Sequence, residues 1–408
     1  MSSWLICSYV FIFYQLWIQI WFFLIKQALF FVNLLSEYNT LIMRKTVILS
    51  VALATLLFSL AANAQPMRRS TPNDTLKSVR VLPDGTTIFS IYAPKARVVN
   101  LVGDAVPWGR PLVPVEKDGV WSFRIPNVKP GAYRYHFVVD GVEVYDPKSP
   151  TTRENTALAV VEPNGKEFFS YNPHIEHGAL AVRSYWSKTL GQTRTMRVWT
   201  PAGYEAGKAK LPVLYLIHGG GDTDVSWPTA GCAGDILDNL LAEGKMVPMI
   251  VVMPNGACDI SMFEKDLMTD IIPFVERNYR VLADKDHRAI SGLSMGGIET
   301  LEVIFQNPDK FGYVWCLSGG FNPGVDIAKE AERLNVKKNA AIINKNCKEF
   351  VMTQGGKTDI TYISGERANK LFDEVGLKYE YQEVGEGHTW YTWKINLYDE
   401  AQRLFKKK

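Results

Sequence analysis

Five short, continuous apolar runs in the second half of the chain constrain its fold more than any other feature. They occupy residues 211–217, 249–253, 289–293, 313–317 and 350–353. Patterns of helical period lie between and after them, at 263–278, 296–305, 365–375 and 391–405. Strands that are apolar throughout and alternate with helices are typical of a parallel sheet buried on both faces. We therefore expect an α/β domain with a mostly parallel central sheet over residues 166–408.

The segment before this domain follows a different rhythm. Short β-type runs at 86–92, 97–102, 120–124, 132–139 and 142–145 are separated by turn residues. Asp140-Gly141, between the last two runs, is a strong hairpin signal. This pattern predicts a small all-β sandwich over residues 80–165, with a polar connector around 163–185.

The first 64 residues contain two candidate export elements. Residues 4–25 carry no charge and are long enough, at about 20 residues, to span a bilayer. Met43 begins a complete signal peptide, with a basic pair, an apolar stretch and an Ala62-Asn63-Ala64 cleavage signal. We expect residues 1–42 to be an upstream extension, or else a membrane helix, residues 43–64 a signal peptide, and residues 65–79 a linker. The mature chain would begin at Gln65, have no stable membrane anchor, and be periplasmic or secreted.

Charge and cysteine patterns narrow the possible partners and cofactors. The 45 basic and 42 acidic residues leave a net charge of +3, and no dense basic run precedes residues 406–408, so we expect no nucleic-acid partner. The chain contains no C-x-x-C and no H-E-x-x-H, and we expect neither a metal nor a cofactor. With Cys7 in the extension, four cysteines remain and allow three complete pairings. We expect mostly free thiols and at most one disulfide.

A glycine-rich turn identifies the candidate nucleophile. Ser294 lies in Gly292-Leu293-Ser294-Met295-Gly296-Gly297, between an apolar run and a helical pattern. A G-x-S-x-G sequence at a strand-to-helix turn exposes the serine hydroxyl above the sheet of an α/β-hydrolase, and its glycines permit the tight turn. We therefore expect Ser294 to be the nucleophile of an ester hydrolase.

Elimination leaves one histidine to activate this serine. In the α/β-hydrolase chain order the base follows both the nucleophile and the acid. Of six histidines only His388 does so, in a loop after the β-type run at 379–384. The other five fall in the predicted sandwich, in the connector or before Ser294: His136, His174, His177, His218 and His287.

The third residue of such a site is a carboxylate that orients the histidine, and it should follow a neighbouring strand. Asp359 follows the run at 350–353 and is the expected acid. Glu383 and Glu386 remain alternatives, although they share the strand and loop of His388.

Two backbone amides should bind the oxyanion of the tetrahedral intermediate. We expect the amide of Met295, which follows the nucleophile, and that of Gly220, in the loop after the first apolar run. Gly219 and Gly221 are alternatives for the second donor. His218, which precedes them, is expected to pack or hydrogen-bond locally.

The predicted sandwich resembles a known class of modules. Its segment 131–137, followed by Val139-Asp140-Gly141 and Asp146-Pro147, is similar to glycogen-binding-type, immunoglobulin-like modules of carbohydrate-active enzymes. The resemblance implies glycan binding through stacking on Trp108 or Trp121. In an alternating strand, however, Trp121 is also expected to pack in the core.

Residues 177–408 resemble the esterase D type of α/β-hydrolase, particularly the feruloyl and acetyl-xylan esterases. The matching motifs include Pro201-Ala202-Gly203-Tyr204, Pro254-Asn255-Gly256, 292–297, Leu317-Ser318-Gly319-Gly320 and Gly387-His388-Thr389. The resemblance implies Ser294, Asp359 and His388 as a catalytic triad. The triad, the predicted sandwich and the signal peptide together lead us to expect a secreted serine carboxylesterase that removes feruloyl or acetyl groups from plant cell-wall xylan or its oligosaccharides. The alternatives are a siderophore (enterochelin-type) esterase, an acyltransferase and a non-catalytic glycan-binding protein.

Overall fold

The computed structural model describes residues 21–30, 49–50, 70–107, 112–146, 148–149, 151–153, 156–322 and 324–406. It divides into two compact units, Met1–Thr71 and Pro72–Lys408. Residues 21–30 of the first unit are helical. Within the described ranges, no helix is long and apolar enough to cross a membrane. The predicted extension and signal peptide fall mostly outside these ranges, and Trp108 lies outside them altogether.

Two antiparallel sheets form the first part of the Pro72–Lys408 unit. One sheet has the order β1-β2-β5-β4 and the other β3-β6-β9-β8, with β7 paired to β6. A single 3-10 turn, Pro72–Asp74, precedes the strands, which are β1 Val79–Val81, β2 Thr87–Tyr92, β3 Val99–Gly103, β4 Val115–Lys117, β5 Val120–Ile125, β6 Gly131–Val139, β7 Val142–Val144, β8 Thr151–Arg153 and β9 Thr156–Val161. Inward-facing Phe89, Phe123 and Phe137 fill the space between the sheets. The predicted sandwich is confirmed, although β1, β4, β8 and β9 were not predicted.

The turn between β6 and β7 has the predicted hairpin geometry. Asp140 and Gly141 both have positive φ, 47° and 87°, as the favoured two-residue hairpin loop requires. The Asp140 carboxylate accepts hydrogen bonds from the amides of Arg97 and Val98, at 2.9 and 2.8 Å. Trp121 packs against the sandwich core, and its indole N–H donates to the Ala93 carbonyl at 3.1 Å. Its packing therefore agrees with the expected core role.

An eight-stranded sheet forms the second part, in the order β10-β11-β13-β12-β14-β15-β16-β17. The strands are β10 Ala179–Ser187, β11 Gln192–Thr200, β12 Val213–Ile217, β13 Ile250–Pro254, β14 Arg288–Leu293, β15 Tyr313–Leu317, β16 Glu349–Gln354 and β17 Glu380–Glu383. All are parallel from β13 to β17, while β10 and β11 form an antiparallel hairpin at one edge. Every predicted apolar run is a strand. The hairpin was missed, and β10 begins inside the predicted connector.

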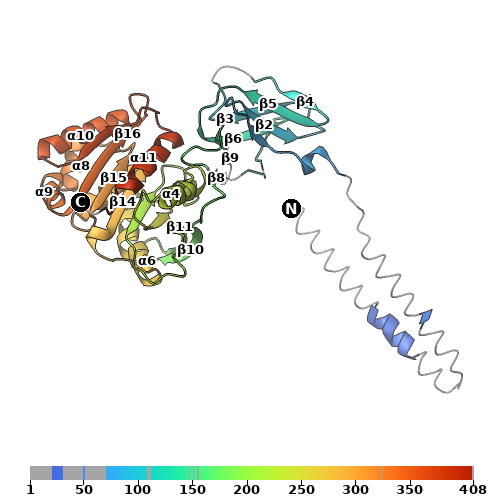
Figure 1. Cartoon of the computed structure of the whole chain (residues 1–408), viewed down its shortest axis with the longest axis horizontal. Coiled ribbons are helices and arrows are strands. Elements are labelled where there is room, and N and C mark those ends of the chain that lie inside the picture. Colours follow the sequence, from blue (N-terminus) through green and yellow to red (C-terminus); the bar gives the residue numbers. More distant parts are fainter. Residues whose placement is uncertain are drawn as a thin grey trace. The chain divides into compact units, whose positions relative to one another are not determined.

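Helices cover both faces of this sheet (Figure 1). One face packs against α3 Ser226–Thr229, α4 Ala233–Ala242 and α11 Trp390–Arg403. The opposite face packs against α5 Ile260–Asp266, α6 Ile272–Asn278, α7 Met295–Gln306, α8 Ile327–Arg333, α9 Val336–Asn346 and α10 Tyr362–Val375. A π-helical segment, Leu267–Ile271, joins α5 to α6, and a 3-10 turn, Lys285–His287, precedes β14. The architecture is the predicted α/β one.

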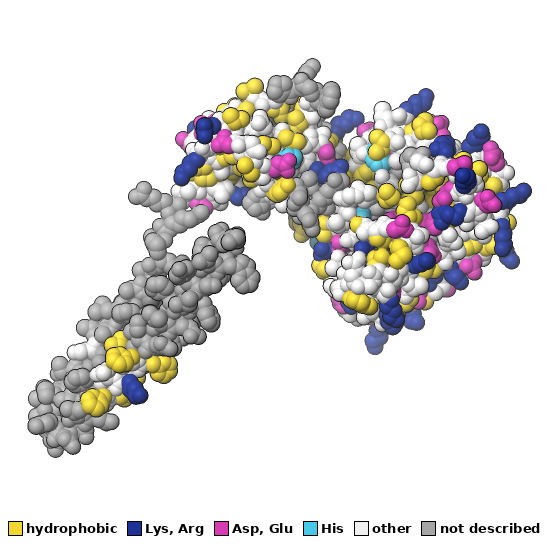
Figure 2. Space-filling view, turned by 180° about the vertical axis from the view of Figure 1, so that it is seen from behind, with side chains coloured by type: hydrophobic (Ala, Val, Ile, Leu, Met, Phe, Trp, Pro, Cys, Tyr) yellow, Lys and Arg dark blue, Asp and Glu magenta, His cyan; other side chains and the backbone are white. Residues whose placement is uncertain are grey.

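The sandwich and the α/β part share buried side chains. Ala132 and Leu158 of the sandwich belong to the same apolar cluster as Trp199, Leu237 and Leu397. Two ion pairs accompany this packing, Lys129–Glu386 at 3.1 Å and Arg134–Asp222 at 3.8 Å. On the face shown in Figure 2, basic and acidic side chains are intermixed, as on an ordinary solvated surface.

Candidate active site

Ser294 lies at the point where β14 turns into α7. Its backbone has φ 54° and ψ −115°, a conformation that costs a non-glycine residue about 1–3 kcal/mol. Two glycines leave room for this turn. A Cβ on Gly292 would lie 2.1 Å from the Gly296 carbonyl oxygen, and one on Gly296 would lie 2.5 Å from the His218 carbonyl oxygen. The predicted strand-turn-helix geometry around Ser294 is therefore present.

The structure brings the three predicted side chains together. The Ser294 hydroxyl lies 3.0 Å from His388 Nε2, and His388 Nδ1 lies 2.7 Å from Asp359 Oδ1. With the ring proton on Nδ1, His388 donates to the carboxylate and accepts from the serine. The Asp359 side chain is fully buried, whereas that of His388 is 15% exposed. This geometry allows His388 to take the proton of Ser294.

Backbone and side-chain donors hold the Asp359 carboxylate in place. The Gly355 amide donates to Oδ2 at 3.0 Å, and Thr361 donates to Oδ1 through its amide and its hydroxyl, at 2.9 and 2.7 Å. Burial opposes the negative charge. The hydrogen bonds from His388 and Thr361 outweigh that effect and hold the pKa of Asp359 well below its usual range. Asp359 is therefore ionised at neutral pH.

The two alternative acids have other partners. Glu386 is paired with Lys129, and Glu383 accepts a hydrogen bond from the Tyr381 hydroxyl at 3.3 Å. Asp359 is accordingly the carboxylate that His388 contacts.

The His388 loop is fixed from two sides. The Gly387 amide donates to the Gly355 carbonyl at 2.7 Å, which joins this loop to the one that carries Asp359. On the other side, the His388 ring packs edge-on against Trp393, with ring centroids 5.0 Å apart. Sequence reasoning missed Trp393. The available signal was the aromatic cluster that follows His388 at the start of α11.

His218 shapes the loop that carries the predicted oxyanion donor. The Gly256 amide donates to His218 Nε2 at 2.8 Å, so the ring proton is on Nδ1, which donates to the Gly219 carbonyl at 2.9 Å. Burial lowers the pKa of His218, and the ring is neutral. Since the peptide unit is planar, fixing the Gly219 carbonyl also fixes the direction of the Gly220 N–H. A Cβ on Gly220 would lie 3.6 Å from Met295 Cβ, so the two predicted donor residues are neighbours.

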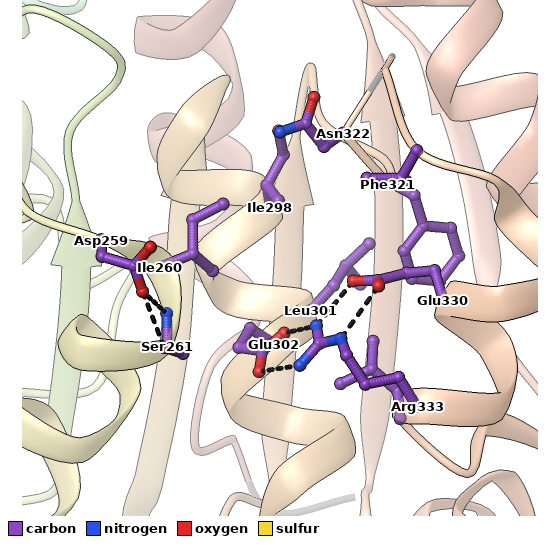
Figure 3. A pocket seen from close by; sticks show the side chains of 12 residues that line it. Asp259, Ile260, Ser261, Ile298, Leu301, Glu302, Phe321, Asn322, Glu330 and Arg333 are labelled. Atoms are coloured by element: carbon purple, nitrogen blue, oxygen red, sulfur yellow. Dashed lines mark hydrogen bonds and ion pairs between the residues drawn. The ribbon is translucent and has the colours of Figure 1, made fainter.

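Two adjoining pockets lie beside the start of α7. The first, of about 260 Å³, is lined by the His218–Gly221 loop, residues 256–260, Met295 and Glu299. The second, of about 200 Å³, shares Asp259 and Ile260 with it. In the second pocket Glu302 and Glu330 both hold Arg333, so the charge of this arginine is already paired (Figure 3).

We also searched the described part of the chain for clusters of metal-ligating side chains and for disulfides. There, no group of three or more His, Cys, Asp and Glu side chains is arranged to hold a metal ion. The four cysteines of the α/β part, Cys232, Cys258, Cys316 and Cys347, are free thiols.

Residues 187–404, more than half of the chain, match the model of the esterase family described as "Putative esterase". The chain belongs to the esterase family. In this esterase, residues 78–151 also match carbohydrate-binding module 48, the isoamylase N-terminal domain.

Two curated relatives of this esterase are named as xylanases. It is 30% identical to an endo-1,4-beta-xylanase/feruloyl esterase of Xylanibacter ruminicola, over 84% of this chain and 48% of the relative. It is 28% identical to endo-1,4-beta-xylanase Y of Acetivibrio thermocellus, over 47% of this chain and 19% of the relative. The esterase thus spans about half or less of the length of these relatives.

Solved structures show the fold of this esterase. An enterobactin esterase from Shigella flexneri aligns with a TM-score of 0.58 and 15% identity, covering 79% of this chain and 94% of that one. A ferulic acid esterase from Anaeromyces mucronatus, solved in complex with ferulic acid, aligns with a TM-score of 0.52 and 23% identity, covering 59% of this chain and 95% of that one. The predicted α/β-hydrolase fold is confirmed.

Proposed function

We propose that this esterase is a serine carboxylic-ester hydrolase that removes feruloyl or acetyl groups from xylan or its oligosaccharides outside the cytoplasm. The hydrogen-bonded series Ser294–His388–Asp359 carries the proposal, because it is the arrangement that makes a serine hydroxyl nucleophilic. The relative named as a xylanase/feruloyl esterase and the match to a carbohydrate-binding module support the substrate class. The candidate signal peptide at 43–64 supports export.

Acylation is the first chemical step. The Ser294 oxygen attacks the ester carbonyl while His388 Nε2 accepts the serine proton, and ionised Asp359 stabilises the resulting imidazolium. The amides of Gly220 and Met295 donate hydrogen bonds to the oxyanion. His388 then gives its proton to the departing sugar oxygen, which leaves an acyl group on Ser294.

Deacylation repeats these steps with water. His388 takes a proton from water, the hydroxide attacks the acyl carbonyl, and the carboxylic acid leaves as Ser294 regains its proton. An acyltransferase would use the same acyl-enzyme with a second alcohol in place of water. Product analysis distinguishes the two reactions.

A substrate panel on matched variants tests the proposal. We expect the purified protein to release acid from methyl ferulate, feruloylated arabinoxylan or acetylated xylan, and Ser294→Ala to lose about 10,000-fold or more in kcat. Ser184→Ala, at an exposed position on β10, serves as the control and should retain full activity. Retained hydrolysis in Ser294→Ala would refute the mechanism. Hydrolysis of an enterochelin-type trilactone with no action on feruloyl or acetyl esters would favour a siderophore esterase.

A further inference from the structure

Trp393 is a buried aromatic residue that contacts the proposed base but takes no part in the proposed chemistry. It lies in the first turn of α11 and is only 5% exposed. Its ring meets the ring of His388 edge to face, with the centroids 5.0 Å apart and the planes at 89°. Aromatic pairs favour this arrangement over face-to-face stacking. The contact therefore restricts the directions in which the imidazole can tilt.

The loop that carries His388 provides little rigidity of its own. Gly385 and Gly387 have φ of 84° and 71°, and glycine backbone can adopt many other conformations at little cost. The hydrogen bond from the Ser294 hydroxyl is lost when the serine becomes acylated. A packing contact does not depend on that hydroxyl or on the protonation of the imidazole. Trp393 can therefore hold His388 through both steps of the reaction.

A row of three indole rings holds Trp393 in turn. Trp393 meets Trp390 edge to face with centroids 5.1 Å apart, and Trp390 meets Trp227 in the same way at 5.4 Å. The Trp227 indole N–H donates to the carbonyl of Ile217 at 3.0 Å. Ile217 ends β12, directly before the loop that carries the expected oxyanion donor. The row thus joins the support of the base to the strand that leads into the oxyanion loop.

Packing alone does not account for these indole rings. Within the described part of the chain, the indole nitrogens of Trp390 and Trp393 are buried and have no hydrogen-bond partner. A buried N–H without a partner lowers stability, and a phenylalanine would fill much of the same space without that loss. The size and direction of the rings are what these positions gain from tryptophan.

We propose that Trp393 is a positioning residue for His388, and that Trp390 and Trp227 hold it in a fixed place relative to the oxyanion loop. The inference rests on the proposed function, in which His388 is the base, but not on the identity of the ester. A misplacement of about 1 Å can cost about 100-fold in rate. Because the contact acts on proton transfer and not on substrate binding, its loss should lower kcat and leave KM nearly unchanged.

Two reactions of Ser294 test this role. One is the hydrolysis of methyl ferulate. The other is the reaction with diethyl p-nitrophenyl phosphate, in which the serine oxygen bonds to phosphorus, nitrophenolate leaves and His388 takes the serine proton. This second reaction can be followed without knowledge of the natural ester.

Replacing Trp393 should slow both reactions. We expect Trp393→Leu to lower kcat and the second-order rate of phosphorylation about 10- to 100-fold, with KM within about 2-fold of the wild type. Trp393→Phe keeps an aromatic ring beside His388 and should retain both rates within about 3-fold. A Trp393→Phe variant as slow as Trp393→Leu would overturn the inference.

Leu397→Ala is the matched control. Leu397 is fully buried one turn further along α11 and belongs to the same apolar cluster as Trp393. We expect it to lower the melting temperature by a similar amount but to leave kcat and the phosphorylation rate unchanged below the transition. Equal losses of rate in Leu397→Ala and Trp393→Leu would show a general loss of packing and overturn the inference.

The part played by the row is tested with Trp227→Leu. If the three rings act as one support, the rate loss in the double variant Trp227→Leu/Trp393→Leu should be smaller than the product of the two single losses. Losses that multiply would overturn this part of the inference.

The two reactions also separate this inference from the proposed function. A wild type that hydrolyses no feruloyl or acetyl ester would refute the proposed substrates. The role of Trp393 would still be supported if that wild type were phosphorylated readily and Trp393→Leu slowly. A wild type that fails in both reactions would refute the mechanism and the inference together.

Discussion

Asp359 remains charged although its side chain is fully buried, because donors from three directions surround it. Gly355, Thr361 and His388 each contribute a hydrogen bond to the carboxylate. A neutral amide in its place would keep the shape but could not stabilise a positively charged imidazole. The residue is thus expected to matter far more for catalysis than for packing.

Asp359→Asn tests this expectation. We predict a fall in kcat of about 10,000-fold with the fold retained, since the amide cannot balance the charge that develops on His388. Ester hydrolysis and circular dichroism measure the two properties. Asp309→Asn, at an exposed site beside Lys310, is the matched control. A kcat within tenfold of wild type would show that another group supports His388.

The lowered pKa of Asp359 also predicts a pH effect on stability. Because the carboxylate is favoured in the folded state, its stabilising contribution is complete above the ordinary pKa of 3.8 and declines as pH falls through the lower folded pKa. The difference in free energy of unfolding between wild type and Asp359→Asn should therefore be larger at about pH 6 than at about pH 3. Urea unfolding at both values measures it, and a difference that grows with acid would contradict the assignment.

A site residue could be predicted where its role requires a recognisable sequence motif or a fixed order along the chain. The approach of Ser294, Asp359 and His388 to one another could be predicted, because the nucleophile motif, the sheet periodicity and the small number of histidines left few choices. The hydrogen bond from the Gly256 amide to His218 could not, since it follows from how the loop after β13 packs against the loop after β12. Those contacts join distant segments and have no local sequence pattern.

At the level of elements, α11 supports the strand that carries the nucleophile. Glu400 of this helix is fully buried and accepts a hydrogen bond from the Ser291 hydroxyl of β14 at 2.9 Å. Burial raises the pKa of Glu400 well above its usual range, so the folded protein keeps this proton to a higher pH than the unfolded chain does. The unfolded chain releases that proton near pH 4.5, and the folded state becomes relatively less favourable as pH rises above this value.

Glu400→Gln removes this penalty. We predict that the variant raises the free energy of unfolding by more than about 1 kcal/mol near pH 8 and by much less near pH 4, where both states are protonated in the wild type. Denaturant titrations at the two pH values provide the measurement. An equal change at both values would mean that packing and not protonation controls the effect.

Elements with a uniform environment were the easier ones to predict. The strands β12 to β16 are buried on both faces and read as continuous apolar runs. The β10–β11 hairpin was missed because β10 is an edge strand with an exposed outer face, where Leu180, Val182 and Trp186 alternate with other residues. Its position is fixed by pairing with β11, a contact that composition alone does not reveal.

For the whole molecule, the sandwich and the α/β part should unfold together. Leu158 of β9 is only 1% exposed and belongs to the cluster that includes Trp199 and Leu397. We predict that Leu158→Ala lowers the free energy of unfolding by about 2–5 kcal/mol. The two parts should still melt in one shared transition, at a lower temperature than in the wild type. Calorimetry combined with esterase activity during heating tests this, with the exposed Val142→Ala as control. Two separate transitions, with the one that destroys activity unchanged, would show that the two parts are independent.

Two backbone hydrogen bonds, from the Gly387 amide to the Gly355 carbonyl and from the Val384 amide to the Gln354 carbonyl, join the loop that carries His388 to the loop that carries Asp359. Ser294 stands apart from these two loops, at the end of the central strand β14. If mild warming displaces β17 and the loop after it, we expect the hydrogen bond between Ser294 and His388 to break first. The hydrogen bond between His388 and Asp359 should persist.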